Sequence, residues 1–206
     1  MTNPARDERY WAGWTGTVVV TPPATEPVGI ADLRAHARLD ASTPDDALIL
    51  GYIQAARRYV EAHTGRSLIT QTLRAHRDAW PSRSEVGIPA GPVQTIASLT
   101  YLDQNLVEQT VPAAHYALDS ARTTSRLYLR AGASWPAVAL APSGAIRLTY
   151  TAGYGAAADV PFPLRQAIML LASHYYEQRL ATGMRELVAM PFGVRELLDV
   201  EGCAWL

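Results

Sequence analysis

The stretch Ala152–Leu180, AGYGAAADVPFPLRQAIMLLASHYYEQRL, determines the fold because its second half carries the clearest helical pattern in the chain. Apolar residues recur there at the i, i+3, i+4 and i+7 spacing of one helical face. The face consists of Leu164, Ala167, Ile168, Leu171, Ala172 and Tyr175. The pattern predicts a long packing helix, and a helix this apolar requires the rest of the chain to cover it.

The residues before this helix predict how it begins. Gly153 and Gly155 mark a turn that follows a strand. Pro161 and Pro163 fit only the first helical turn, where a missing N–H group costs no hydrogen bond. Asp159 suits the positive end of the helix dipole. The order is therefore strand, glycine turn and helix.

A short first helix is predicted at about Ile30–Leu39. Gly29 occupies its cap position and Asp32 its first turn. Val28 and Leu33 have the spacing of a hydrophobic staple, in which the residue before the cap packs on the first turns.

A second helix has the clearest start signal, with Thr43 as cap and Pro44 as the first helical residue. Gly65 ends it in the left-handed position. Its predicted apolar stripe is Leu48, Ile49, Tyr52, Ile53, Ala56, Tyr59, Val60 and His63, with Arg57, Arg58 and Glu61 off the stripe. We expect this stripe to pack against the helix that follows Pro163.

The middle of the chain changes from helical to alternating periodicity, which is typical of strands joined by turns. Expected strands are 68–77, 93–102, 106–109, 116–119, 126–129 and 145–150, with a hairpin turn at Asp103–Asn105. Short strands at this spacing predict one antiparallel sheet. The fold class is therefore α+β: two N-terminal helices and a long closing helix form a helical core, with a β insertion at about 68–151.

Both ends are expected to extend from a connector domain at 28–183. Residues 1–27 form an arm that contains Trp11 and Trp14. This arm either pairs with the domain as an edge strand or reaches a neighbouring subunit. Residues 184–206 form a docking tail that folds back on its own domain or is buried in a partner. Its candidate portal-binding or neighbour-binding residues are Phe192, Val194, Leu197, Leu198 and Trp205.

Composition restricts the class of protein. Hydrophobic residues make up 49% of the 206-residue chain and charged residues 18%, which is typical of a globular protein and not of a disordered one. The formal net charge is −1, from 18 basic and 19 acidic side chains. Proteins that depend on binding duplex DNA usually carry a basic excess, so DNA binding here would require a local patch.

The single cysteine, Cys203, excludes an internal disulfide and hence a disulfide-stapled secreted fold. The first residues lack the apolar core of a signal peptide. No run approaches the roughly 18–20 apolar residues that span a bilayer. We expect a protein made and kept in the cytoplasm, or in an assembly built there, with no membrane contact.

No set of residues predicts catalysis, a metal or a cofactor. His63 and His174 lie on or beside apolar stripes, which favours packed or half-buried side chains. Cys203 has no neighbouring helix start or base to activate it. Gly153–Gly155 lacks the Gly-Lys-Ser/Thr of a phosphate loop, and prolines follow where backbone donors would be needed. The protein is predicted not to be an enzyme.

Several short segments follow one another with characteristic gaps: Val28–Leu33, Arg38–Asp40, Asp45–Ile49, Tyr59–Glu61, Thr64–Arg66, Pro92–Ile96, Thr100–Tyr101, Trp135–Pro136, Tyr150–Gly155, Leu164–Ile168 and His174–Glu177. The ordered series resembles the head–tail connector (adaptor) proteins of long-tailed bacteriophages and related gene transfer agents. One departure is Gly29, where the resemblance leads us to expect a Ser or Thr cap.

The resemblance implies a structural virion protein assembled in the host cytoplasm. It implies a homo-oligomeric ring, twelvefold, that lies beneath the portal of the DNA-filled head and links it to the stopper or tail. The C-terminal segment would engage the portal, and DNA would be only passing cargo. A near-neutral charge suits a channel in which DNA must slide.

Two rival hypotheses remain at this stage. The first is a nucleic-acid-binding packaging factor that uses Arg57, Arg58, Arg66, Arg74 and Arg77. The second is a small hydrolase with Cys203 or a histidine in its site.

Overall fold

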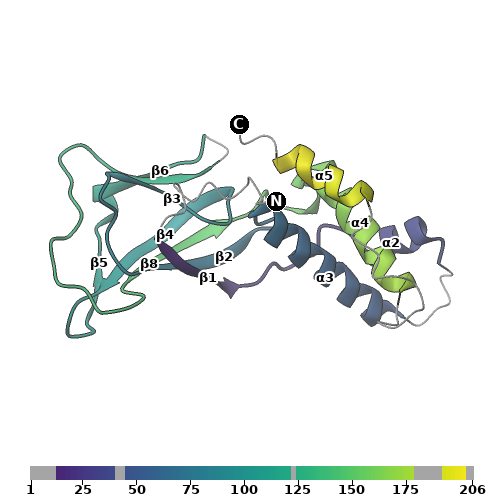
Figure 1. Cartoon of the computed structure of the whole chain (residues 1–206), viewed down its shortest axis with the longest axis horizontal. Helices are drawn as coiled ribbons and strands as arrows, with labels where there is room; N and C mark the ends of the chain where they lie inside the picture. Colours follow the sequence, from purple (N-terminus) through teal and green to yellow (C-terminus); the bar gives the residue numbers. More distant parts are fainter. Residues whose placement is uncertain (1–12, 40–44, 122–123, 179–191, 203–206) are drawn as a thin grey trace. The chain divides into compact units, whose positions relative to one another are not determined.

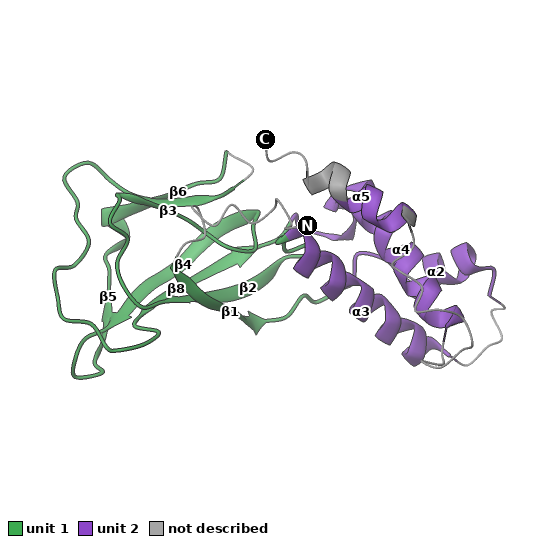
Figure 2. Cartoon of the chain, in the orientation of Figure 1, with its two compact units in different colours: residues 1–24, 65–153 green, residues 25–64, 154–206 purple. Residues whose placement is uncertain are grey.

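The computed structural model describes residues 13–39, 45–121, 124–178 and 192–202. The chain divides into two compact units, which Figure 2 shows in separate colours. Residues 1–24 and 65–153 make up the β unit, and residues 25–64 and 154–206 make up the helical unit. The β insertion predicted at about 68–151 lies within the β unit.

The helical unit is built from α2 (Ile30–Ala37), α3 (Asp46–Thr64), α4 (Phe162–Glu177) and α5 (Phe192–Gly202) (Figure 1). The first three correspond to the predicted helices. The predicted cap Thr43 and first helical residue Pro44 lie outside the described residues. Together with the antiparallel sheets of the β unit, these helices confirm the α+β class.

Helix α4 is buried along the predicted face: Leu164, Ala167, Ile168, Leu171 and Ala172 are at most 3% exposed, and Tyr175 is half-buried. Pro161 is its N-cap and Pro163 lies in its first turn, as predicted. Asp159 has a different role. Its carboxylate accepts the N–H of Ala156 at 2.8 Å and so closes the preceding 3-10 turn, Ala157–Asp159.

Helix α3 packs on α4 through the predicted stripe. Ile49, Ile53, Ala56 and Val60 are fully buried. The Tyr52 ring lies 6.4 Å from the rings of Tyr175 and Tyr176 in α4. The prediction that Leu48 belongs to the buried stripe was wrong. Leu48 lies in the first turn of α3 and is 39% exposed.

Two strand systems form the β unit. One sheet has the order β1-β2-β8-β4-β5, and the other has the order β3-β7-β6. All pairings are antiparallel. The strands are β1 (Trp14–Thr21), β2 (Gln71–Arg77), β3 (Glu85–Gly87), β4 (Val93–Leu102), β5 (Glu108–Thr110), β6 (Tyr116–Asp119), β7 (Arg126–Leu129) and β8 (Ile146–Ala152). The prediction of one sheet was therefore wrong, and β3 was not predicted.

A single core joins the two sheets. It takes Leu73, Leu99 and Leu148 from the five-stranded sheet, and Val86 and Leu127 from the three-stranded one. On β8, residues alternate between buried and half-buried, which is the period of a strand with one face in a core. Apolar burial against the second sheet thus fixes the register of β8.

Gly153, in the predicted glycine turn, has a backbone that only glycine tolerates. Its φ is +130°, and a Cβ added there would lie 2.5 Å from the carbonyl carbon of Ile69. Its N–H donates to the carbonyl of Pro92 at 2.9 Å, and its carbonyl accepts the Gln94 amide at 2.8 Å. Gly153, the last residue of the β unit, is therefore held in place by hydrogen bonds of its own backbone N–H and C=O groups.

Replacing Gly153 with Ala should destabilise the protein by about 2 kcal/mol or more, because the methyl group meets backbone atoms at a positive φ. Gly51→Ala is the matched control. A Cβ at Gly51 meets nothing within 4 Å, on the exposed side of α3. It should stabilise the protein by roughly 0.5–1 kcal/mol. Urea unfolding measures both changes, and equal effects would contradict this account.

Candidate functional site

Trp14, a predicted arm contact, belongs to the protein's own sheet. It starts β1, and its indole Nε1 donates to the Gly87 carbonyl at 2.7 Å. The ring packs on the β core and lies under the Arg77 guanidinium at 5.9 Å. Two alternatives were predicted for the N-terminal arm: an edge strand of its own domain, or an arm that reaches a neighbouring subunit. Residues 14–21 form an edge strand. Trp11 lies outside the described residues.

Two alternatives were also predicted for the C-terminal segment: it folds back on its own domain, or it is buried in a partner. Val194 is 0% exposed and Leu198 1% exposed, because α5 packs on α4 and α3. This part of the tail folds back on its own helical unit, so these two side chains are not available to a partner. Leu197 is half-buried. The side chain of Phe192 and the whole of Trp205 lie outside the described residues.

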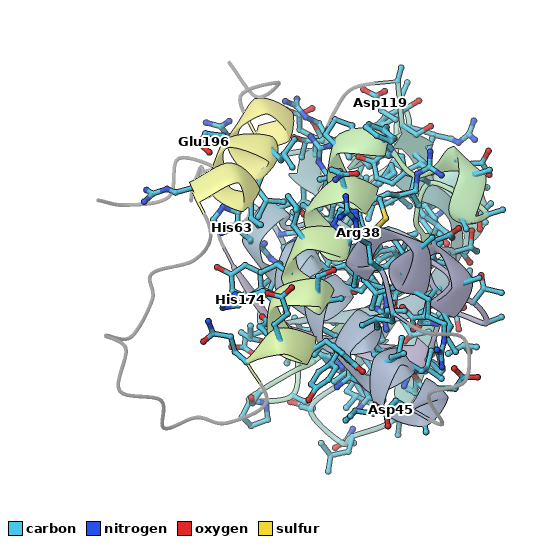
Figure 3. The ribbon with its side chains drawn as sticks, turned by 90° about the vertical axis from the view of Figure 1, so that its right-hand side faces the viewer. Arg38, Asp45, His63, Asp119, His174 and Glu196 are labelled. Atoms are coloured by element: carbon cyan, nitrogen blue, oxygen red, sulfur yellow. The ribbon has the colours of Figure 1, made fainter. Side chains whose placement is uncertain are left out.

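The outer side of α5 is exposed at Gly193, Arg195 and Glu196, the last of which Figure 3 labels. The helix thus has one apolar side turned into the helical unit and one polar side turned outward.

Strand β1 is exposed at every residue after Trp14. Val18, Val19 and Val20 are 54%, 56% and 47% exposed. Among the described strands, β1 pairs with β2 alone, so one of its backbone edges has no strand beside it. At the other edge of the same sheet, Leu106 and Val107 precede β5 and are 67% and 50% exposed.

The five arginines of the nucleic-acid hypothesis are divided between the two units. Arg57 and Arg58 belong to the helical unit, and Arg66, Arg74 and Arg77 belong to the β unit. Arg57 and Arg66 are buried, at 6% and 7% exposure. Arg74 donates to the Thr149 hydroxyl at 3.2 Å, and Arg77 donates to the Ala79 carbonyl at 2.7 Å. Four of the five side chains are therefore buried or hydrogen-bonded within the fold: Arg57, Arg66, Arg74 and Arg77.

Arg57 joins helix α3 to the segment that precedes α2. Its Nε lies 2.7 Å from the Glu26 carboxylate, and its Nη1 lies 2.6 Å from the Glu61 carboxylate. All three side chains are at most 15% exposed. The prediction that Arg57 lies off the buried stripe was wrong, because two carboxylates compensate the burial of its charge.

The half-buried face of the five-stranded sheet carries several basic groups. His76 of β2 lies opposite Arg147 of β8, and Arg74 lies beside it on the same face. Burial, then Arg147 and Arg74, lower the pKa of His76, while a hydrogen bond with the Gly144 backbone opposes the shift. Glu108 of β5 lies 3.6 Å from Arg147. Burial is therefore the main cause of the lowered pKa of His76, and the two arginines add to it.

The predicted packing of two histidines is confirmed. His63 of α3 stacks on Tyr59 with ring centroids 6.2 Å apart, and His174 of α4 lies 6.3 Å from Tyr175 (Figure 3). Both are half-buried.

The described residues contain no cluster of three or more His, Cys, Asp and Glu that would hold a metal ion. No helix in this part of the chain is long and apolar enough to cross a membrane. The glycine turn uses two of its amides internally, since Gly153 donates to Pro92 and Ala156 donates to Asp159.

Known proteins resemble this chain in sequence and in structure. The family profile "phage gp6-like head-tail connector protein" matches residues 28–111. No curated protein matches the chain. A solved structure titled "Neck of empty GTA particle computed with C6 symmetry" contains a chain that is 31% identical, with a TM-score of 0.74 over 90% of this chain and 94% of that one.

Two further solved structures agree. "Virion of native gene transfer agent (GTA) particle" contains a chain 32% identical, with a TM-score of 0.72 over 89% of this chain and 93% of that one. "Neck of native GTA particle computed with C12 symmetry" gives 31% identity and a TM-score of 0.72, over 90% and 94%. This chain belongs to the phage gp6-like head–tail connector family, a class of structural virion proteins.

Arg57→Leu should lower the free energy of unfolding by about 3–5 kcal/mol, because Glu26 and Glu61 are then buried without their shared cation. Arg58→Leu, at the adjacent exposed position, is the matched control and should change stability by less than about 0.5 kcal/mol. Guanidinium unfolding measures both. An Arg57 variant as stable as wild type would refute the structural role.

The lowered pKa of His76 predicts a pH dependence of folding. The folded state favours neutral His76, so this contribution to stability is complete above the ordinary histidine pKa of 6.5. It is lost as the pH falls through 6.5 towards the lower folded-state pKa. His76→Gln should therefore flatten the decline of Tm below that pH. His115→Gln, at an exposed position of the same unit, retains His76 and should keep the wild-type decline.

Proposed function

We propose that this protein is the adaptor of a head–tail neck, in a gene transfer agent or a related phage particle. In this role it forms a ring between the portal and the stopper or tail, and DNA passes through the ring. The observation that carries the proposal is similarity at 31–32% identity to neck and virion chains over about nine tenths of both partners. Similarity that extends over both units argues for a shared role and not merely a shared domain.

The symmetry of the related necks supports a ring. The related necks were computed with C6 and C12 symmetry, which places identical copies around an axis. A cyclic ring joins two different surfaces of each subunit head to tail. A twelvefold ring of this chain is the arrangement we propose.

The distribution of charge supports DNA as passing cargo. Several arginines are paired with carboxylates: Arg34 with Asp46 at 2.7 Å, Arg126 with Glu85 at 3.2 Å and Arg147 with Glu108 at 3.6 Å. Proteins that hold duplex DNA neutralise many phosphates with free cations. With a formal net charge of −1, this chain is suited to a channel wall that DNA slides past.

The C-terminal end is the proposed portal contact. Val194 and Leu198 anchor α5 in the helical unit. The residues that follow α5 include Trp205, and tryptophan is enriched among residues that dominate binding energy at interfaces. The revised proposal is therefore that α5 positions the segment 203–206 and the exposed side of the helix for the portal.

Deleting residues 203–206 should leave the fold intact and weaken attachment to portal-bearing heads by at least about tenfold, because an interface tryptophan is lost. Co-sedimentation with purified heads measures attachment, and thermal unfolding monitors the fold. Gly51→Ala, on the exposed side of α3 and outside the proposed contact, is the control and should attach as wild type does. Deletion of 190–206 is a poorer test, since it removes Val194 and Leu198 from the helical core.

Two failures are distinguishable. If the deletion variant attaches as tightly as wild type, the portal contact lies elsewhere on the chain and only that part of the proposal fails. If wild-type protein does not attach to portal-bearing heads at all, the adaptor role itself is refuted.

A further inference from the structure

Strand β1 has the properties of an unprotected sheet edge. It is eight residues long and, among the described strands, hydrogen-bonds only with β2. From Thr15 to Thr21 every residue is exposed, so neither face of the strand is covered within the described chain. Edge strands of monomeric proteins are commonly shielded by charged residues or proline. The sequence WTGTVVVT contains neither.

The valines of β1 add an apolar surface to this open backbone. Val18, Val19 and Val20 are each about half exposed, at 54%, 56% and 47%. Successive residues of a strand point to opposite faces, so the three side chains line both sides of the edge. A strand added beside β1 would therefore bury apolar surface on both faces while pairing with its free N–H and C=O groups.

The opposite edge of the same sheet presents a second apolar surface. Leu106 and Val107 precede the outermost strand, β5, and are 67% and 50% exposed. The Asp103 carboxylate accepts the N–H groups of Asn105 at 2.8 Å and of Val107 at 3.0 Å. Leu106 has a φ of 63°, a left-handed conformation that leucine seldom adopts. The two hydrogen bonds to the Asp103 carboxylate thus hold residues 103–107 in one conformation, with the side chains of Leu106 and Val107 exposed.

The β1 edge and the β5 edge have different sequences, and they form the two opposite edges of the five-stranded sheet. A head-to-tail ring requires two different surfaces on each subunit, whereas two identical edges pairing with each other would give a closed dimer. The related neck chains were computed with C6 and C12 symmetry, so another copy of the same chain is available on either side.

We propose that β1 of one copy lies against residues 106–110 of the next copy, so that the five-stranded sheet continues from subunit to subunit. β5 has only three residues, so backbone pairing is short there. Contact of Leu106 and Val107 with the valines of β1 supplies the apolar part of the interface. The inference rests on the proposed ring and assigns the surfaces that join it.

Cysteine cross-linking in assembled particles tests this assignment. A Cys203→Ser chain has no other cysteine, so introduced thiols react alone. In this background, Val19→Cys and Val107→Cys are combined, and purified necks are treated with a flexible bis-maleimide. A ladder of covalent oligomers beyond the dimer is expected. Within one copy the two positions are four strand spacings apart across the sheet, which is at least ~19 Å at ~4.8 Å per spacing. They also lie at different levels along the strands, because Val19 is aligned with Ile96 of β4 and Val107 lies beside Asp103. This separation disfavours a link within one chain.

Three controls separate the alternatives. Each single-cysteine variant should remain monomeric on denaturing gels, because a dimer from Val19→Cys alone would mean that β1 pairs with β1, against the proposal. Tyr128→Cys with Val107→Cys should give no ladder. Tyr128 is 39% exposed and lies in β7, the middle strand of the three-stranded sheet, outside both edges. It therefore measures chance collisions.

The outcomes also separate this inference from the adaptor role. Necks that contain the double-cysteine chain but yield no ladder overturn the edge-to-edge contact and leave the adaptor role standing. Particles whose necks lack this chain, as judged by immunoblot of wild-type preparations, refute both. A ladder obtained only with Val107→Cys and Val19→Cys together supports the proposed contact.

Discussion

The helical unit depends on the burial of α4 against α3. These helices come from opposite sides of the β insertion, and neither has enough local stabilisation to form alone. Their contact buries Ile53 and Val60 of α3 and Leu164 and Ile168 of α4, among others. At its edge the Tyr176 hydroxyl lies 3.1 Å from the Asp45 carboxylate. The helical unit therefore forms only when residues on both sides of the insertion come together.

Much of this could be predicted from local patterns. The 3.6-residue period located α4 and its buried face, and alternation located β4, β6 and β7 with the bounds that the structure has. These signals are strong because one face of each element is buried. Proline and glycine also fixed the start of α4 and the end of α3, where backbone geometry allows few alternatives.

Other features depend on contacts that local patterns do not contain. Arg57 is buried because Glu26 and Glu61 both reach it, and Glu26 is 31 residues away in sequence. Strand β3 has three residues, too few to show a period, and forms only by pairing with β7. Local pattern also does not decide whether α5 folds back or extends, since an apolar helix face is equally suited to its own domain or to a partner. The order of known connector segments, not any single site, indicated the family.

In the proposed role, this chain is an assembly component that makes its contacts through its sheet edges and its C-terminal end. Electron cryomicroscopy of purified particle necks tests this claim most directly. The prediction is a closed ring of this chain immediately beneath the portal, twelvefold, with a central passage that contains DNA in filled particles. Density for this chain away from the portal, or its absence from the neck, would contradict the account.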